Sequence, residues 1–388
     1  MSTTFIYTFI FCSLLAITVS AQTGDWVEAF RAPTGSRIQT TTQLYGTPTS
    51  ISDDGKVVAV GCETSSGIWE TRIFRDAQST GWVLEKTIPN SGFSVSVSGD
   101  GSKIALGNIF SSAQAGKVEV VKWDSGSSDW VREGAEVTTE ASQSMTGYSV
   151  SLNGDGTTMI IGYKQHPGDG KLRGRIEIYE FENDSWHSKF VQNGDTDMMR
   201  LGHAVVMNRD GNHAAASGAN EADGIVYHFD NEEGVWTRNT NSFTGAYKSS
   251  YGNSLSASSD GSIFAVAAWK DIVDIRRGQN GVVRFNSPTD DNIRPSIRYS
   301  YPNGMFGASV SLSADASIVA IGTNSFLGGV YVYSWDETTQ AWNTLKHIPI
   351  STTTALGRSV SLSASGTRLL YVERTSRQLV VVDYVQQR

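Results

Sequence analysis

The side chains that could carry out chemistry are spread along this sequence and do not form a known catalytic motif. The chain has no His-Glu-x-x-His motif, no phosphate-binding loop and no Gly-x-Ser-x-Gly nucleophile turn. We therefore predict no catalytic residue, no metal ligand and no cofactor. Paired carboxylates of the kind that glycosidases use stay possible, because distant segments can meet in a folded site. The six histidines lack the spacing of metal ligands: His166, His187, His203, His213, His228 and His347.

Two connecting segments combine aromatic, histidine and cationic side chains, which suit a carboxylated, sulfated or sugar-bearing ligand. They are residues 163–173 and 269–277. We predict ligand contacts there, because loops on a rigid scaffold commonly carry function. The alternative is that both segments are solvated loops without a specific role. The candidate contacts are Lys164, His166, Trp269 and Lys270.

A nine-residue frame recurs seven times and predicts the elements that position these loops. A small/apolar alternation runs between its two ends, as in Ser94–Ser98, and is typical of a β-strand packed on both faces. The frames follow one another at intervals of 46 to 55 residues, long enough for one four-stranded sheet per repeat. The frames open at Gly46, Gly92, Gly147, Gly202, Gly252, Gly307 and Gly357, and close at Gly55, Gly101, Gly156, Gly211, Gly261, Ala316 and Gly366.

Each repeat contains the signals of four strands. The frame strand ends in a tight turn such as Asp100-Gly101, which favours a hairpin. A second strand follows at once, a third begins after a variable loop, and a tryptophan starts the fourth in every unit except the fifth and the last. These tryptophans are Trp82, Trp130, Trp186, Trp236 and Trp342.

The chain ends predict a closed ring instead of an open solenoid. The seventh unit stops after three strands, near residues 379–384, while an unassigned strand with the Asp-Trp-Val pattern lies at residues 25–30. Pairing these two segments completes the last sheet and removes an exposed strand edge. An open solenoid would instead need polar caps at its ends.

We therefore predict an all-β fold, a seven-bladed β-propeller of four-stranded antiparallel blades whose N-terminal strand closes the last blade. Residues 22–388 form this single domain after a signal peptide at 1–21. The predicted blades span about 46–90, 92–138, 147–193, 202–244, 252–300, 307–350 and 357–384, with residues 25–32 as the fourth strand of the last.

The frame resembles the FG-GAP repeat of integrin α-chain propellers and many secreted microbial proteins. The residues that carry the resemblance include Phe306-Gly307 with Val319–Gly322, Tyr251-Gly252 and Leu356-Gly357. The resemblance implies a propeller and, more weakly, adhesion or binding. Calcium-binding members have an acidic loop between the first two strands, and here a tight turn replaces it. Kelch repeats are a second possible resemblance, on Gly328-Gly329, and also form propellers.

The residue after each frame glycine is predicted to lie at the mouth of the central channel, on the same side as the variable loops. These residues vary although the repeat is regular, as a ligand site requires, but drift in sequence would give the same variety. The set is Thr47, Phe93, Tyr148, His203, Asn253, Ala308 and Arg358, of which we predict that Phe93, Tyr148, His203, Asn253 and Arg358 bind a ligand.

The N-terminus has the pattern of a secretory signal. Phe5–Val19 is an uncharged apolar run, and Val19-Ser20-Ala21 resembles a cleavage site, with cleavage after Ala21. Because no Lys or Arg precedes the run, an uncleaved anchor is the alternative. Cleavage leaves Cys62 as the one cysteine, either a buried apolar side chain or a reactive thiol. Asn183-Asp184-Ser185 is a glycosylation sequon in a predicted turn.

These observations predict a secreted, extracellular glycoprotein that acts as a binding or cell-adhesion module for a protein or glycan. The net charge of −8 gives no general reason to bind nucleic acid or anionic membranes, and we expect a monomer whose mature chain does not insert into a membrane. The alternative is a secreted propeller enzyme, a hydrolase or lyase acting on polysaccharide.

Overall fold

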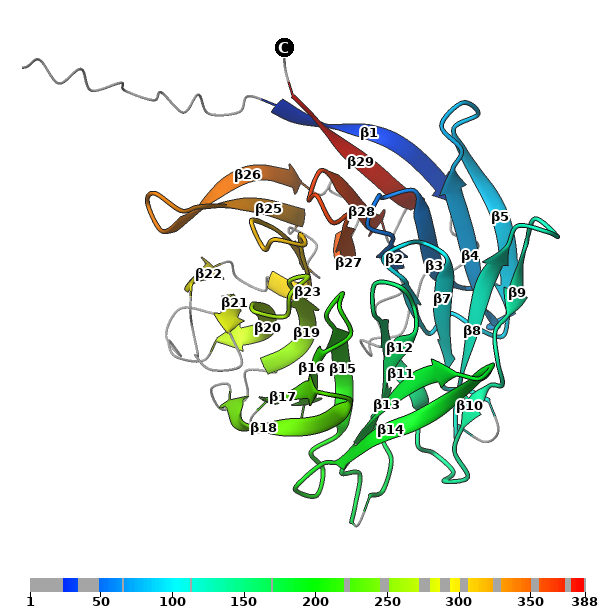
Figure 1. Cartoon of the computed structure of the whole chain (residues 1–388). Coiled ribbons are helices and arrows are strands. Elements are labelled where there is room, and N and C mark those ends of the chain that lie inside the picture. The colour runs from blue at the N-terminus through cyan, green and yellow to red at the C-terminus, as the bar shows by residue number, and fades with distance from the viewer. Residues whose placement is uncertain are drawn as a thin grey trace, which may run out of the picture.

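The described part of the chain consists of β-strands in seven sheets around one axis, one sheet for each copy of the frame (Figure 1). No helix in that part is long and apolar enough to cross a membrane. The computed structural model describes residues 24–33, 49–64, 66–111, 114–168, 170–219, 224–244, 251–271, 280–286, 294–300, 306–323, 329–349, 356–373 and 378–386. The predicted signal peptide, its cleavage site at Ala21, and Thr47 lie outside these ranges.

The strands of each blade run antiparallel and follow one another from the axis to the rim. Blade one contains β2 (Thr49–Ile51), β3 (Val57–Glu63), β4 (Trp69–Asp76) and β5 (Trp82–Pro89). Blade two contains β6 (Ser94–Val97), β7 (Lys103–Asn108), β8 (Lys117–Asp124), β9 (Asp129–Arg132) and β10 (Val137–Thr138). Blade three contains β11 (Thr146–Leu152), β12 (Thr158–Tyr163), β13 (Arg175–Glu182) and β14 (Ser185–Asn193). Blade four contains β15 (Leu201–Met207), β16 (His213–Ala219), β17 (Gly224–Glu232) and β18 (Val235–Thr244).

The other three blades complete the ring. Blade five contains β19 (Tyr251–Ala257), β20 (Phe264–Asp271), β21 (Asn280–Asn286) and β22 (Arg294–Ser300). Blade six contains β23 (Phe306–Leu312), β24 (Ile318–Thr323), β25 (Gly329–Asp336) and β26 (Ala341–Pro349). Blade seven contains β27 (Leu356–Leu362), β28 (Arg368–Glu373), β29 (Gln378–Gln386) and the N-terminal strand β1 (Gly24–Pro33).

The prediction of four strands in every blade is wrong, because the sheet of blade two has five. Its rim position is divided between β9 and β10, which both pair with β8. From Arg132 to Val137 the rim strand advances by five residues, whereas the paired stretch of β8, from Val121 to Val118, advances by three. The two extra residues form a bulge that interrupts the rim strand. Gly134 adopts a φ of +71° in this bulge.

The chain ends close the ring as their sequences predict. β1 pairs antiparallel with β29, with Asp25 opposite Val385 and Phe30 opposite Val381, and the two strands lie side by side in Figure 1. Trp26 is buried, and its ring centroid lies 5.6 Å from that of Tyr384. Closure of the ring therefore pairs the outer edge of β29 with β1 and adds the contact between Trp26 and Tyr384.

The frame serines connect neighbouring blades. In five of the seven junctions, the hydroxyl of a serine on one innermost strand accepts a hydrogen bond from the backbone N–H of the next innermost strand. Large side chains at these positions would keep the strands apart, which explains the small/apolar alternation. The pairs are Val97 N to Ser50 Oγ (3.0 Å), Leu152 N to Ser96 Oγ (2.9 Å), Met207 N to Ser151 Oγ (3.0 Å), Leu312 N to Ser256 Oγ (2.9 Å) and Leu362 N to Ser311 Oγ (2.9 Å).

A closed ring of backbone hydrogen bonds also connects the blades, where the innermost strands enter their hairpins. Each blade donates one amide to the next, so the ring needs no particular side chain. The bonds run from Asp53 N to Gly99 O, Asp100 N to Gly154 O, Gly154 N to Arg209 O, Arg209 N to Ser259 O, Ser259 N to Ala314 O, Ala314 N to Ala364 O, and Ala364 N to Asp53 O, at 2.7–3.2 Å.

The frame glycines are required at the other end of the innermost strands. Gly147 has a φ of +77°, in the region that favours glycine. A Cβ on Gly107, at the end of the second strand of the preceding blade, would lie 2.2 Å from the carbonyl oxygen of Gly147. Two backbones therefore meet here without space for a side chain.

Cys62 is a buried core residue. It is 1% exposed on β3 and packs with Val60 and Phe74. Burial raises the pKa of its thiol to about 12, so the thiolate that would make it reactive is suppressed. The structure therefore favours the first of the two roles expected for this residue.

Deleting residues 22–32 should destabilise the protein more than Trp26→Ala alone. The deletion removes β1 and exposes the edge of β29, whereas the substitution removes one buried aromatic side chain, typically at a cost of ~3–5 kcal/mol. Secretion yield and light scattering after expression measure the effect. Removing residues 385–388 instead should be mild, and equal yields for the two truncations would contradict this role of β1.

Replacing Ser151 by alanine should lower the free energy of unfolding by about 1–3 kcal/mol. The backbone N–H of Met207 would lose its acceptor inside the ring, and an unsatisfied buried donor carries a cost of that size. Urea denaturation measures the change. Ser188→Ala, on the exposed rim strand β14, is the control and should have almost no effect.

Candidate ligand-binding face

The two faces of the propeller differ in the connections that they carry. The strands alternate in direction, so the turns between first and second strands and between third and fourth strands share one side, the hairpin face. The connections between second and third strands, and those between blades, share the opposite side, the loop face. The predicted site residues all belong to the loop face.

Consecutive residues of the predicted channel mouth contact one another. The ring centroids of Phe93 and Tyr148 lie 5.4 Å apart, and those of Tyr148 and His203 lie 5.5 Å apart. His203 Nε2 lies 3.4 Å from Asn253 Oδ1, and Asn253 Nδ2 donates to the carbonyl oxygen of Ala308 at 3.2 Å. The structure thus assembles a continuous row from residues about 50 positions apart in the sequence. Whether this row binds a ligand stays a prediction.

Lys164 joins this row from the end of β12. Its Nζ donates to the hydroxyl of Tyr148 at 2.7 Å and lies 4.2 Å from the centroid of the same ring. The side chain is buried, and burial, followed by the positive charge of Arg200, lowers the pKa of Lys164 to about 7. The structure therefore brings together two residues that were predicted on separate grounds.

Arg200 is a member of this site that the sequence analysis missed. Its Nε is buried and, among the described residues, has no hydrogen-bond partner; the same holds for His203 Nδ1. Burial, then Lys164 and Arg200, lower the pKa of His203 to about 3. The available signal was its place just before the frame, because Arg200 is the one cation that stands two residues before a frame glycine. We call Tyr148, Lys164, Arg200, His203 and Asn253 the mouth site.

An aromatic groove adjoins the mouth site between blades one and two. Its cavity of about 490 Å³ lies between Trp69 and Phe110 on one side and Lys117 and Glu136 on the other. The ring of Phe110 is 53% exposed and stacks on Trp69 at 6.4 Å. Phe110 also lies 5.8 Å from Phe93, which in turn contacts Tyr148 of the mouth site at 5.4 Å.

The other predicted contacts are not all placed in the mouth site. His166 is buried, and its Nδ1 accepts a hydrogen bond from Gly168 N at 2.9 Å, within its own loop. Trp269 and Lys270 belong to β20 and Arg358 belongs to β27, but their side chains lie outside the described part of the structure.

Asn183 lies where the sequon predicts, in the turn between β13 and β14. It is exposed and has a φ of +50°, followed by +62° at Asp184. In the described ranges, no three His, Cys, Asp or Glu side chains are grouped to hold a metal ion.

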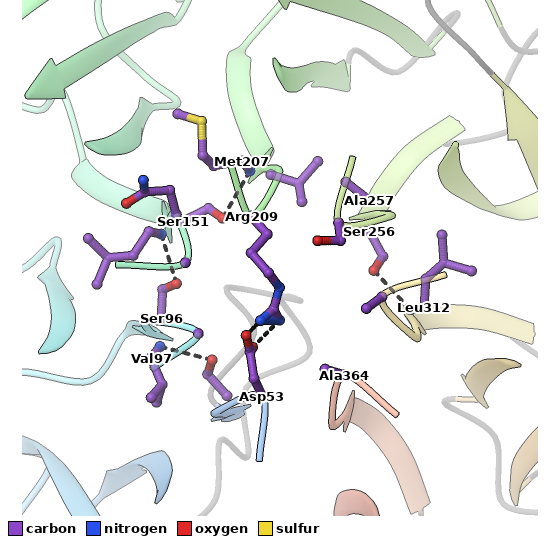
Figure 2. Close-up of a pocket in the computed structure, with 18 of the residues that line it drawn as sticks. Asp53, Ser96, Val97, Ser151, Met207, Arg209, Ser256, Ala257, Leu312 and Ala364 are labelled. Atoms are coloured by element: carbon purple, nitrogen blue, oxygen red, sulfur yellow. Dashed lines mark hydrogen bonds and ion pairs between the residues drawn. The ribbon is translucent and has the colours of Figure 1, made fainter. Parts of the chain in front are cut away.

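An ion pair lies across the channel at the hairpin face. Arg209 of blade four reaches Asp53 of blade one, and Figure 2 shows the two side chains meeting between the hairpins. A Cβ on Gly99 would lie 2.5 Å from Asp53 Oδ2, and one on Gly154 would lie 2.7 Å from Arg209 Cγ. Glycine at these two positions therefore leaves the space that the pair occupies.

Above this pair lies a small channel cavity of about 190 Å³, lined by residues of all seven innermost strands. Its wall includes the serines that connect the blades, such as Ser96 and Ser151 (Figure 2). The cavity is too small for a polymer. A wider cavity of about 550 Å³ also opens at the hairpin face, lined by Asp54, Asp100, Asp155 and Asp210.

Comparison with known proteins supports the fold and does not identify a family. No protein-family model matches the chain, and no curated protein matches it. Hydrazine synthase of Kuenenia stuttgartiensis has a chain that is 14% identical, with a TM-score of 0.62, over 91% of this chain and 100% of that one. The Cps50 (Swd1) β-propeller domain of Myceliophteria thermophila is 12% identical, with a TM-score of 0.59, over 90% and 99%. A putative 6-phosphogluconolactonase of Bacteroides fragilis is 17% identical, with a TM-score of 0.55, over 82% and 87%. At these identities the similarity shows a β-propeller and nothing about function.

A double-mutant cycle should reveal the ion pair across the channel. Asp53→Asn and Arg209→Gln, alone and together, should give a coupling of about 0.5–3 kcal/mol in urea denaturation, because each change leaves the other charge partly buried. The exposed rim pair Lys189–Glu182 is the control, with an expected coupling of at most about 0.5 kcal/mol. Equal couplings for the two pairs would show that the Asp53–Arg209 contact adds nothing to closure.

Proposed function

We propose that the protein is a secreted, non-catalytic binding module whose loop face takes an extracellular glycan or protein. The observation that carries this proposal is that the exposed Phe110 and the partly buried His203 and Asn253 are connected on the loop face through the buried rings of Phe93 and Tyr148. Binding sites combine apolar walls with a few polar groups in this way. The resemblance of the frame to FG-GAP repeats supports an adhesive role.

The sequence features outside the site support an extracellular location. The apolar segment Phe5–Val19 has the length and setting of a secretory signal, and Asn183 is exposed at a turn that a glycosylating enzyme can reach. The net charge of −8 gives no reason to expect nucleic acid as a partner. We propose a monomeric glycoprotein outside the cell.

An enzyme acting on polysaccharide is the second candidate, and one observation favours it. Lys164, with a pKa lowered to about 7 and a hydrogen bond to the Tyr148 hydroxyl, has the properties of a proton-transfer pair. Tyr148 is only 1% exposed, however, and Lys164 only 8%, so a substrate has little access to either group. The five residues of the mouth site also include no carboxylate, whereas glycoside hydrolysis generally uses two. Binding is therefore the better supported function.

A panel of extracellular glycans and proteins, assayed for both binding and turnover, tests the proposal. We expect the wild-type protein to bind at least one member and to release no product. His203→Asn and Phe110→Ala should each weaken binding about tenfold or more, since both remove a side chain of the loop-face row. Asp210→Asn, on the exposed hairpin face, is the control and should bind as wild type does.

Product release that is lost in Lys164→Met would establish the enzyme instead. Binding that depends on Asp210 but not on His203 or Phe110 would place the site on the wrong face.

A further inference from the structure

The cations of the mouth site raise one another's electrostatic energy. Arg200 lowers the pKa of both Lys164 and His203, and Lys164 lowers that of His203. Arg200 makes no ion pair with a described carboxylate, and its Nε has no hydrogen-bond partner there. Because partly buried charges are usually paired, an anionic ligand is a partner that this arginine can take.

An anion between these groups would remove the repulsion. It would accept hydrogen bonds from Arg200 Nε–H and, with the imidazole protonated so that Nε2–H still donates to Asn253 Oδ1, from His203 Nδ1–H. Tyr148 and Lys164 would form the floor of such a site, since Nζ already contacts the phenol at 2.7 Å. The geometry therefore favours a ligand with a compact negative group such as a carboxylate or a sulfate.

The adjoining groove indicates what carries that negative group. Ring contacts of 5.4–5.8 Å connect the exposed Phe110 through the buried rings of Phe93 and Tyr148 to His203, so only a few side chains separate the groove from the mouth site. The exposed ring of Phe110 offers a flat apolar surface to a sugar ring. Polar side chains for sugar hydroxyls line the same cavity, among them Asn90, Asn108, Lys117 and Glu136.

On the basis of the proposed function, we infer that the ligand is an acidic saccharide. Its carboxylate or sulfate binds at Arg200 and His203, and a further sugar ring stacks on Phe110 in the aromatic groove. Arg200 is then a specificity-determining residue, because it selects a negative group.

Calorimetric titration with four defined probes tests this inference. The probes are a heparin-derived sulfated oligosaccharide, an oligogalacturonate, a neutral cello-oligosaccharide and a poly-glutamate peptide. We expect one of the two acidic saccharides to bind, more weakly as NaCl is raised, and to identify sulfate or carboxylate as the preferred group. Arg200→Gln should weaken this binding about tenfold or more, and Phe110→Ala should weaken it less.

Lys189→Gln, a cation on the rim strand of blade three, is the matched control and should bind as wild type does. The melting temperature of Arg200→Gln without ligand should equal or exceed that of wild type, because the substitution relieves repulsion. A structural arginine would instead lower it. This comparison also shows that the variant is folded.

The outcomes separate the inference from the proposed function. Equal binding of an acidic saccharide by wild type and Arg200→Gln, or a preference for the neutral saccharide that needs His203 and Phe110, would overturn the inference and leave the binding module intact. A preference for poly-glutamate would replace the saccharide by an acidic peptide. Failure of every probe here and in the wider panel would overturn both.

Discussion

Contact between the innermost strands of neighbouring blades is the constraint on which the rest of the structure depends. Seven backbone hydrogen bonds of 2.7–3.2 Å close a ring at the hairpin end, and five serine hydroxyls accept amides of the adjacent blade beside it. Both sets of bonds require the strands to approach closely, which excludes large side chains. This requirement explains the serines of the frame and the glycines at positions such as Gly107 and Gly147.

The same constraint places the candidate site. Near the axis the backbones are held by glycine and serine, and the residue directly after each frame glycine differs from blade to blade. Those residues necessarily come close to one another around the axis, as the contacts of Tyr148 with Phe93 and His203 illustrate. A regular scaffold thereby brings together side chains about 50 residues apart, from Phe93 of blade two to Asn253 of blade five.

The two ends of the channel use charge in opposite ways. At the hairpin face, Arg209 is paired with Asp53 across the axis, and the contact is made possible by two glycines. At the loop face, Arg200 lies near Lys164 and His203, and burial together with mutual repulsion lowers the pKa of both of those groups. A paired charge stabilises ring closure, whereas burial and the charge of Arg200 disfavour a positive charge on Lys164 and His203, an effect that a bound anion would oppose. This contrast is our reason for placing recognition on the loop face.

Much of the architecture could be predicted from the sequence because the repeat encodes it locally. Alternation, Asp-Gly turns and the rim tryptophans indicate strand positions, and the surplus strand around Trp26 indicates how the ring closes. The break in the rim strand of blade two could not be predicted, because it depends on register against β8. The partners of individual side chains could not be predicted either: Arg200 stands outside the frame, and the Asp53–Arg209 pair joins blades one and four.

The sequence by itself thus determined the strands, their order and the residues near the axis, since these follow from short-range patterns. Only the tertiary structure decided which charges are paired and which repel, because that depends on distances between residues that no local pattern connects.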